Sequence, residues 1–386
     1  MADDGFRPGQ KLCRGTLLFW VTVTVAGVLA ISVLLGTLRW LGTPAPVTQT
    51  RADPEGQIRL NLKNRLSGTL EGLTKSRRIY WISRDALAAP APDPACYGRA
   101  EQAGELGFLG RKADNLLDGQ ALFFDGEVMP LPGTPIRYYL DDTILAITWK
   151  QPIDGGVYTF SEVKIAHPSQ LRRFLAGGTF GSDKLFVTTE MAKSVNAVVA
   201  SSGDFYNYRQ AGTLVYDGQV RRVHNGLVDT CYVDENGDLL FSGRDEDRSR
   251  QESQNFVDER NILFSLAFGP VLIREGEVVT PETYAVGEIN DHYPRSALCQ
   301  LGKLHYLLAV VNGEGDYQQT PTLRRFGEVL QSRGIQTAYT LDGGQTAVIA
   351  MGGELINSVL FGYQRKISDI IYFATAIPGK AQETAE

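Results

Sequence analysis

One acidic residue followed by two glycines offers the clearest chemistry in this chain. Asp342 follows a strand-like stretch at 336–341 and precedes Gly343 and Gly344. A second apolar stretch follows at 347–349. The pattern predicts a strand, an Asp-Gly-Gly turn and a strand, which places one carboxylate at the mouth of a core. The glycines remove side chains beside the acid, so a ligand or another backbone segment can approach it closely. The alternative is an ordinary Asp-Gly hairpin without a chemical role.

The same order, an apolar stretch followed by small residues and an acid, occurs earlier in the chain. Residues 195–200 are mostly apolar, and Ser202, Gly203 and Asp204 follow them. A short apolar run bounded by small polar residues is typical of a strand. The sequence therefore offers a second carboxylate at Asp204, whose alternative role is to cap the turn in which it lies.

A strand, a helix and a strand lead up to Asp342. Residues 304–311 form a nearly continuous apolar run, typical of a buried strand, which ends at Asn312. Residues 322–333 place apolar side chains at helical spacing, and 336–341 return to a strand pattern. Such a unit favours two parallel strands lying side by side. We therefore expect Asn312 and Asp342 to emerge at the same edge of one sheet, where ligands of α/β sheets collect.

The rest of the chain after about residue 136 alternates strand patterns with turn residues and a few helical stretches. The predicted fold is α/β of the mixed α+β kind: a mixed β-sheet core with hairpins and a few helices, preceded by one N-terminal transmembrane helix. The expected elements are strands at 143–149 and 157–165, short helices at 169–175 and 188–194, and hairpins at 212–220 and 231–241.

The N-terminus has the pattern of a membrane anchor. Arg7, Lys11 and Arg14 precede an uncharged, mostly apolar stretch at 16–38, and Arg39 follows it. That length suits one crossing of the bilayer, and the basic residues before it predict a cytoplasmic N-terminus. The alternative is a cleaved signal peptide, with small residues at 42–45 as the cleavage region. We expect a single-pass protein of the cell membrane whose C-terminal domain is extracellular.

Composition excludes several classes of function. The chain has 386 residues, of which 43% are hydrophobic, so it is long enough for a sizeable globular core. Its net charge of -6 argues against nucleic acid as a partner. Four cysteines, at 13, 96, 231 and 299, lie far apart and show neither the spacing of a zinc site nor that of a disulfide framework.

Six ordered blocks resemble the signature of the phosphodiester glycosidase family. Residues 341–346 resemble its LDGGGS motif, and the other blocks are 202–206 for NGGFF or NGDYF, 268–270 for FGP, 294–297 for PRTA, 311–314 for VDGR and 368–372 for the closing strand. The chain is thereby identified as similar to a bacterial, membrane-anchored member of the family. The resemblance implies a phosphodiester glycosidase-like domain at 137–376. With the charge and apolar patterns described above, the predicted organisation is a cytoplasmic N-terminus (1–15), an anchor (16–38), a linker and membrane-proximal region (39–136), this domain and a tail (377–386).

The chain departs from the family pattern at several positions. Ser202 replaces the family Asn, Asn312 and Glu314 replace the Asp and Arg of VDGR, and Gln345 and Thr346 replace the last Gly and Ser of LDGGGS. The change from Arg to Glu at 314 reverses a charge and would weaken recognition of a phosphate. The alternative to an enzyme is therefore a catalytically decayed protein that binds carbohydrate or phosphopolymer, or assists exopolysaccharide assembly.

The resemblance implies a hydrolase that splits a sugar from a sugar-1-phosphodiester, and hence roles for the candidate residues. Because phosphate leaves as a stable anion, strong acid assistance is less necessary than in ordinary glycosides. Asp342 would be the nucleophile or the base for water, Asp204 the second carboxylate, and Arg295 the phosphate ligand. Arg295 could instead form a structural ion pair with Asp342 or Asp291. The remaining candidates for substrate binding are Ser202, Gly203, His292, Asn312, Glu314, Gly343, Gly344 and Thr346.

The expected partners are a carbohydrate phosphodiester or an envelope glycopolymer. No cofactor is required by this chemistry, although Asp204 and Asp342 could together hold a divalent cation, calcium or magnesium. His292 precedes Arg295 by three residues and is a candidate acid, whereas a single loop histidine is more often incidental. The predicted hydrolase requires that Asp204, Asp342 and Arg295 meet in one cavity open to solvent.

Overall fold

The computed structural model describes residues 79–81, 131, 134, 136–140, 143–285, 288–313 and 319–375. The chain divides into two compact units, Met1–Asp53 and Pro54–Glu386, and every described residue belongs to the second. The predicted anchor at 16–38 and the candidate Glu314 lie outside the described residues. Among the residues that are described, no helix combines the length and the apolar character needed to cross a membrane.

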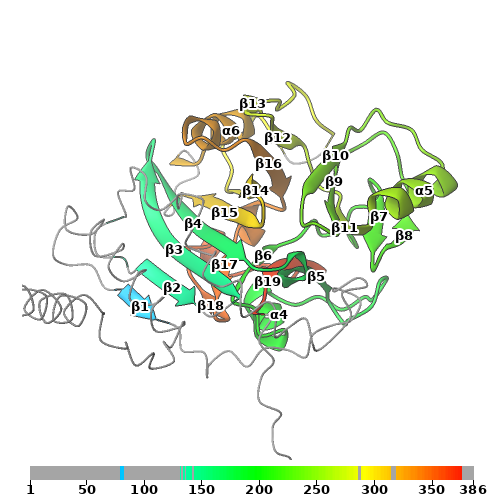
Figure 1. The fold of residues 1–386 in the computed structure, drawn as a ribbon. Helices are drawn as coiled ribbons and strands as arrows, with labels where there is room; N and C mark the ends of the chain where they lie inside the picture. Colours follow the sequence, from blue (N-terminus) through cyan, green and yellow to red (C-terminus); the bar gives the residue numbers. More distant parts are fainter. Residues whose placement is uncertain are drawn as a thin grey trace, which may run out of the picture. The chain divides into compact units, whose positions relative to one another are not determined.

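The largest element of the fold is a nine-stranded sheet with the order β1-β2-β3-β4-β15-β14-β16-β12-β13 (Figure 1). Long β-branched and aromatic stretches form its centre, as the sequence predicts for 143–149 and 157–165. Its strands are β1 (Ile79–Trp81), β2 (Ile136–Leu140), β3 (Ile144–Ile153), β4 (Gly156–Ile165), β12 (Val271–Arg274), β13 (Glu277–Val278), β14 (Arg295–Gly302), β15 (His305–Asn312) and β16 (Thr337–Leu341).

Two five-stranded sheets pack with the nine-stranded sheet. The first has the order β10-β9-β11-β7-β8 and contains β7 (Leu214–Tyr216), β8 (Gln219–Arg222), β9 (Thr230–Asp234), β10 (Leu239–Ser242) and β11 (Ile262–Leu266). The second has the order β18-β17-β6-β19-β5 and contains β5 (Leu171–Leu175), β6 (Val199–Ser202), β17 (Ile349–Met351), β18 (Glu354–Leu355) and β19 (Asp369–Phe373).

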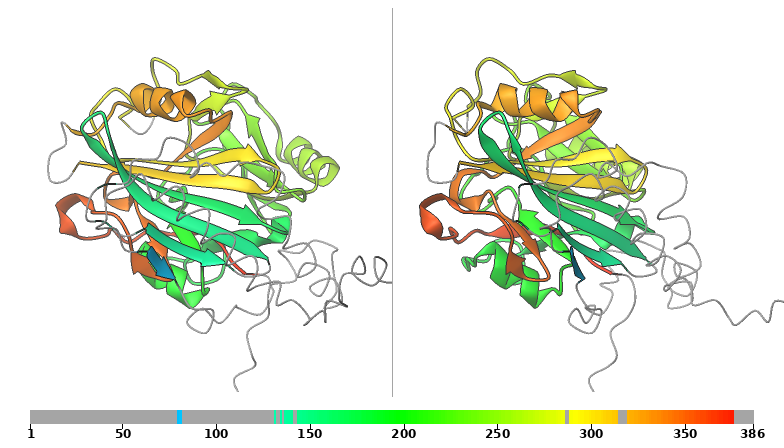
Figure 2. Two further views of the ribbon diagram at one scale, coloured as in Figure 1. Left: turned by 60° about the vertical axis from the view of Figure 1, so that its left-hand side comes forward. Right: turned by 90° about the vertical axis from the view of Figure 1, so that its left-hand side faces the viewer.

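The described helices are few. They are α4 (Thr188–Ser194), α5 (Arg250–Arg260) and α6 (Leu323–Ser332), with short 3-10 turns η5 (Pro168–Gln170), η7 (Gly344–Thr346) and η8 (Leu360–Gly362). The helix predicted at 322–333 is α6: Thr322 caps its first turn by accepting from the Arg325 N–H, and Gly334 follows it at a φ of +84°. Figure 2 shows α6 beside the long strands of the nine-stranded sheet.

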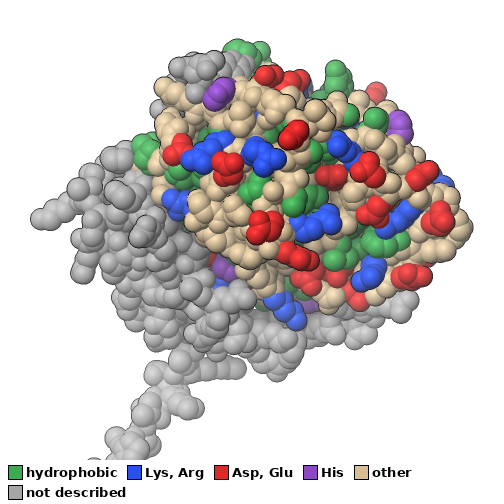
Figure 3. All heavy atoms as spheres, turned by 90° about the horizontal axis from the view of Figure 1, so that it is seen from above, with side chains coloured by type: hydrophobic (Ala, Val, Ile, Leu, Met, Phe, Trp, Pro, Cys, Tyr) green, Lys and Arg blue, Asp and Glu red, His purple; other side chains and the backbone are tan. Residues whose placement is uncertain are grey.

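A shared core holds the three sheets together. It includes Leu308 and Tyr339 of the nine-stranded sheet, Phe264 of the first five-stranded sheet and Ile371 of the second, all buried. The opposite face of the nine-stranded sheet packs on a separate core that includes Phe326 of α6. On the surface drawn in Figure 3, acidic and basic side chains are interspersed and not gathered by sign. The fold is thus a layered β structure, more strongly β than the α+β class predicted.

The prediction that β15 and β16 lie side by side is wrong, but the prediction that they run in the same direction is confirmed. β15 and β16 do not lie side by side, because β14 is inserted between them and pairs antiparallel with both. The two strands nevertheless run in the same direction, so the ends at Asn312 and Leu341 lie at the same edge of the sheet. Among the described strand pairs, only β1 with β2 is parallel.

Two further predictions of local structure are wrong. Residues 169–175 form a single 3-10 turn followed by β5, because Leu171 and Leu175 are buried as part of the second five-stranded sheet. The segment around Asp342 is not a hairpin: β16 belongs to the nine-stranded sheet and β17 to the second five-stranded sheet. The Asp-Gly-Gly segment therefore carries the chain from one sheet to another.

Candidate active site

The two strand-and-acid segments meet at their backbones. The Asp342 N–H donates to the carbonyl oxygen of Gly203 at 3.1 Å, and the Ser202 hydroxyl donates to the carbonyl oxygen of Asp342 at 2.9 Å. The end of β6 therefore lies beside the end of β16, although 140 positions separate Ser202 from Asp342. Ser202 and Gly203 act here by positioning Asp342 through main-chain contacts.

The two glycines after Asp342 are explained by a close backbone approach. A Cβ atom at Gly343 would lie 2.6 Å from the carbonyl oxygen of Pro294, and one at Gly344 would lie 2.6 Å from the ring of Tyr293. Gly344 also adopts a φ of +64° and donates its N–H to the Pro294 oxygen at 2.9 Å. The segment 293–294 is thus the neighbour that requires glycine at both positions.

A cleft of about 230 Å³ opens beside Asp342. It lies between the loops that follow β6, β11 and β16 and those that precede β14 and β19. Its polar lining consists of Arg209, Glu288, Arg295, Thr340, Asp342, Gln345 and Arg365, and its aromatic lining of Phe205, Tyr208, Phe268, Tyr293 and Phe361. Such a mixture of aromatic faces and convergent polar groups is typical of a small-molecule site.

Asp342 is a buried carboxylate with a cationic partner at the cleft. Its side chain is 8% exposed and accepts a hydrogen bond from the Arg365 guanidinium at 2.7 Å. Burial raises the pKa of Asp342 above its ordinary value, while Arg365 and Arg209 act to lower it. The carboxylate therefore becomes a stronger base than an exposed aspartate without losing the charges that stabilise its ionised form.

Arg209 is a second cation of the cleft. Its guanidinium lies over the Phe268 ring, 4.1 Å from the centroid, and no ion pair within the described residues includes it. Burial lowers the pKa of Arg209, and the charges of Asp342 and Glu288 act in the opposite direction. Glu288, an exposed residue of the same lining, supplies a second carboxylate.

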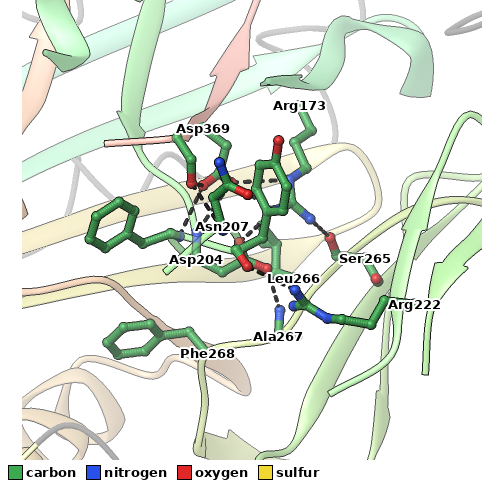
Figure 4. A network of polar contacts seen from close by, with 12 residues as sticks. Arg173, Asp204, Asn207, Arg222, Ser265, Leu266, Ala267, Phe268 and Asp369 are labelled. Atoms are coloured by element: carbon green, nitrogen blue, oxygen red, sulfur yellow. Dashed lines mark hydrogen bonds and ion pairs between the residues drawn. The ribbon is translucent and has the colours of Figure 1, made fainter. Parts of the chain in front are cut away.

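Asp204 lies outside the cleft lining, in a buried ion-pair network (Figure 4). One of its oxygens pairs with the Arg173 guanidinium at 2.5 Å, and the other accepts from the Ala267 N–H at 2.7 Å. The side chains of Asp204 and Arg173 are both fully buried. This geometry favours a positioning role for Asp204 over the catalytic role that the sequence suggests.

Asp369 is the third member of this network, which we call the Arg173 network (Arg173, Asp204 and Asp369). Its carboxylate lies 2.9 Å from Arg173 and accepts from the N–H groups of Asp204 at 3.2 Å and Phe205 at 2.9 Å. Burial raises the pKa of Asp369 to about 7, with Arg173 lowering it and Asp204 raising it further. Two acids share one guanidinium, so one negative charge remains uncompensated when both are ionised.

The Arg173 network holds two walls of the cleft. Asp369 fixes the backbone at Asp204 and Phe205, and the segment after Phe205 carries Arg209 into the cleft lining. Asp204 fixes the backbone at Ala267, which is followed by Phe268, the cleft residue whose ring lies under the Arg209 guanidinium. A buried network of this kind orients cleft residues without contacting a ligand itself.

The other predicted ligands are engaged with the protein. The Arg295 guanidinium donates to the carbonyl oxygens of Glu288 at 2.9 Å and Asp291 at 2.6 Å, and the His292 ring contacts the Thr320 oxygen. The Asn312 side chain accepts from the Asn357 amide at 2.9 Å, and the Thr346 hydroxyl donates to the Gly343 oxygen at 2.6 Å. Arg295, Gly343 and Gly344 line the cleft, whereas Ser202, His292, Asn312 and Thr346 do not.

The sequence patterns do not indicate three charged residues of the cleft. Arg209, Glu288 and Arg365 lie in loops without a recognisable motif, and their side chains meet only because the loops of three sheets converge. The one signal in the sequence is position, since Arg365 lies just before the predicted closing strand at 368–372.

Within the described part of the chain, no group of three or more His, Cys, Asp or Glu side chains is arranged to hold a metal ion.

Comparison with known proteins identifies the domain that contains this cleft. Residues 195–374 match the family model described as phosphodiester glycosidase. These residues form a domain of the phosphodiester glycosidase family. The match includes Asp342, Arg365 and Arg209, and it begins later than residue 137, where the sequence resemblance suggested a start. Membership in the family supports a phosphodiester glycosidase type of function for the domain.

Individual relatives are distant. An uncharacterised SPbeta prophage-derived protein of Bacillus subtilis (strain 168) is 23% identical over 198 residues, which cover 50% of this chain and 30% of that protein. The chain therefore corresponds to less than a third of the length of this curated relative.

Solved structures resemble the chain at low identity. The catalytic domain of zebrafish N-acetylglucosamine-1-phosphodiester alpha-N-acetylglucosaminidase, auto-inhibited by its pro-peptide, has a TM-score of 0.48 and 18% identity, and the similarity covers 60% of this chain and 83% of that one. A hypothetical protein from Synechocystis has a TM-score of 0.44 and 17% identity, with coverage of 63% and 64%.

Proposed function

We propose that this chain is a hydrolase that cleaves a sugar from a sugar-1-phosphodiester. The family match of residues 195–374 supports the reaction class. The observation that carries the proposal is the buried carboxylate of Asp342, paired with Arg365 at 2.7 Å in a cleft that also contains Arg209. A carboxylate beside two guanidinium groups suits a substrate that develops positive charge at the anomeric carbon and releases an anionic phosphate.

Asp342 has two mechanistic roles that are consistent with its position. As a nucleophile, its carboxylate oxygen would bond to the anomeric carbon while the bond from that carbon to the phosphate oxygen breaks, and water would then hydrolyse the glycosyl ester. As a base, it would take a proton from the water that attacks the same carbon. In both cases the phosphate departs with the electron pair of the broken bond and needs no proton.

In the proposed mechanism the second carboxylate is Glu288 and not Asp204, the residue that the sequence suggests. It lines the cleft with Asp342, while the Asp204 carboxylate is committed to Arg173 and Ala267. If Asp342 is the nucleophile, an exposed carboxylate such as Glu288 can accept the proton of the water that releases the sugar. Glu288→Gln should then slow the second step and leave the burst of released phosphate monoester intact.

We further propose that the enzyme is anchored in the cell membrane by residues 16–38 and acts outside the cytoplasm on an envelope polymer or exopolysaccharide. The support is the uncharged stretch between Arg14 and Arg39 and the excess of basic residues before it. Alkaline extraction of membranes from a bacterial host that produces the full chain should leave the protein in the pellet. Recovery of a mature protein that lacks the first forty or so residues would replace the anchor by a cleaved signal.

The alternative function is a catalytically decayed protein that binds carbohydrate or phosphopolymer. It is favoured by the Arg295 guanidinium, which is bound to backbone carbonyl groups, and by the replacements at Ser202, Asn312 and Gln345. Incubation of the full chain with a sugar-1-phosphodiester, followed by assay of free sugar, separates the two functions. Polymer binding without any sugar release, and the same binding by Asp342→Asn, would establish the decayed protein.

A further inference from the structure

Three buried polar atoms in the cleft lack hydrogen-bond partners within the described structure. They are Arg209 Nη1, Thr340 Oγ1 and Gln345 Nε2. A buried donor that is left without a partner costs roughly 1–3 kcal/mol, so such groups are rare in folded proteins and require an explanation. Their occurrence in the lining of one cleft indicates a ligand that accepts hydrogen bonds.

Each of the three groups is held in place by a different part of the fold. Thr340 lies on β16, two residues before Asp342, and is only 4% exposed. Side chains two residues apart in an extended chain point to the same face, and both Thr340, on β16, and Asp342, the residue after its end, line the cleft. Gln345 lies in η7, and Arg209 rests on the Phe268 ring. The cluster therefore combines one cation with an amide N–H and a hydroxyl.

The other two arginines of the cleft are engaged differently. Arg365 is paired with Asp342, and the Arg295 guanidinium donates to main-chain oxygens of Glu288 and Asp291. Arg209 takes part in no ion pair of the described residues, and the nearby carboxylates of Asp342 and Glu288 act on it only through their charge. Arg209 is consequently the guanidinium best placed to bind an external anion.

We propose that Arg209, Thr340 and Gln345 form the subsite that binds the phosphoryl oxygens of the substrate. The proposal rests on the proposed function, because it assigns the phosphate end of the same substrate to one side of the Asp342 cleft. An oxyanion with several acceptor oxygens satisfies all three donors and the charge of Arg209. The anomeric carbon then lies next to Asp342, and the leaving group lies on the Arg209 side.

The proposal gives Gln345 a role in substrate specificity. The family signature LDGGGS has a glycine at this position, which offers no side-chain donor, whereas Gln345 adds an amide in the cleft lining. The carboxylates of Asp342 and Glu288 also line the cleft, and they disfavour a second negative charge on the phosphate. The subsite should therefore prefer a singly charged diester to a doubly charged monoester.

Direct binding tests the subsite independently of catalysis. Titration calorimetry with the full chain would use inorganic phosphate as the first probe, dimethyl phosphate as the diester probe and acetate as a carboxylate of similar size. Gln345→Gly and Thr340→Val should each weaken phosphate binding about tenfold, and Arg209→Gln should weaken it more, because hydrogen bonds to charged groups contribute the larger share. Acetate should bind more weakly than phosphate, and dimethyl phosphate should bind more tightly than methyl phosphate, which is added as the doubly charged monoester probe.

Thr280→Val is the matched control for Thr340→Val. The Thr280 hydroxyl is also buried without a partner among the described residues, but Thr280 does not line the cleft. Its replacement should leave phosphate binding unchanged. Equal loss in both threonine variants, unchanged binding in the Gln345 and Arg209 variants, or no binding of phosphate by the wild-type chain at millimolar concentration would each overturn the subsite.

The outcomes separate this proposal from the proposed function. Phosphate binding that depends on Gln345 and Arg209, without any release of sugar, would retain the subsite and remove the hydrolase. Release of sugar with a KM that is unaffected by Gln345→Gly and Thr340→Val would retain the hydrolase and remove the subsite.

Discussion

The carboxylate of Asp342 and the guanidinium of Arg365 form an ion pair at 2.7 Å, although 23 positions separate them along the chain. Asp342 follows β16 of the nine-stranded sheet, and Arg365 precedes β19 of the second five-stranded sheet. The Asp342 side chain is nearly buried, while that of Arg365 is 43% exposed. The pair therefore joins two sheets at the cleft, and Arg365 lowers the pKa of Asp342 against the larger, opposite effect of burial.

Replacement of Asp342 by asparagine should abolish the release of sugar. Asparagine preserves the shape of the side chain but can neither attack the anomeric carbon nor accept a proton from water, so the rate should fall by roughly 10²–10⁴. The measurement is free sugar released from a sugar-1-phosphodiester. Asp154→Asn is the control, because Asp154 is half exposed and pairs with Arg325 away from the cleft lining. Full turnover by Asp342→Asn would exclude Asp342 from the mechanism.

Replacement of Arg365 by glutamine should move the acid limb of the pH–rate profile. Asp342 acts only when ionised, so activity is lost as the pH falls through its pKa, which burial already raises above the ordinary value. Because Arg365 lowers this pKa, its loss should raise the pKa further and move the acid limb of kcat/KM to higher pH. Arg365→Lys should restore most of the wild-type profile. A shift to lower pH would contradict the assigned electrostatics.

Sequence patterns were sufficient for local elements but not for the pairing of strands. The apolar spacing within 322–333 predicts α6, and the stretches at 143–149 and 157–165 predict β3 and β4. The insertion of β14 between β15 and β16 could not be read from either strand, because both strands are buried on their two faces. Non-local pairing depends on which surfaces are complementary after folding, and a single sequence contains no direct signal for that.

The sequence indicates Asp342, the central residue of the candidate site, but not the charged residues that lie around it. Asp342 was found because glycines follow it, and the reason for those glycines proved to be packing against Tyr293 and Pro294. Asp204 had the same local pattern, but its pairing with Arg173 depends on β5, a strand that the sequence had suggested as a helix. A motif shows which residue types are present, whereas the burial and pairing of a carboxylate are decided by distant segments.

The stability of the domain should fall as the pH rises from about 4 toward 7. Asp369 has a pKa of about 7 in the folded protein and an ordinary value of 3.8. Between these values the folded state holds a proton that the unfolded state has released, so each unit of pH lowers the free energy of unfolding by at most about 1.4 kcal/mol. Urea unfolding at pH 5, 6, 7 and 8 measures this slope. Asp369→Asn, which cannot titrate at this position, should lack this part of the slope, and an equal slope in the two proteins would show that Asp369 is already ionised between pH 5 and 7.

Replacement of Gly203 by alanine should disrupt the Arg173 network. A Cβ atom at Gly203 would lie 1.8 Å from Oδ2 of Asp369, an oxygen that is buried and paired with Arg173 at 2.9 Å. The carboxylate would have to leave its partner, and above pH 7, where Asp369 is mostly ionised, breaking the buried ion pair should cost about 3–5 kcal/mol. The measurement is the midpoint and slope of urea unfolding, with Gly243→Ala as the control.

Gly243 is suited to this comparison because its added Cβ would have only Glu246 Oε1 nearby, at 4.0 Å. Its replacement should change the free energy of unfolding by no more than about 0.5 kcal/mol. Because Asp369 holds the backbone of Phe205, the Gly203 variant should also lose the cleft wall that carries Arg209, and with it phosphate binding. Equal stability of the two glycine variants would mean that the end of β6 can move away from Asp369, and the Arg173 network would then not fix the cleft.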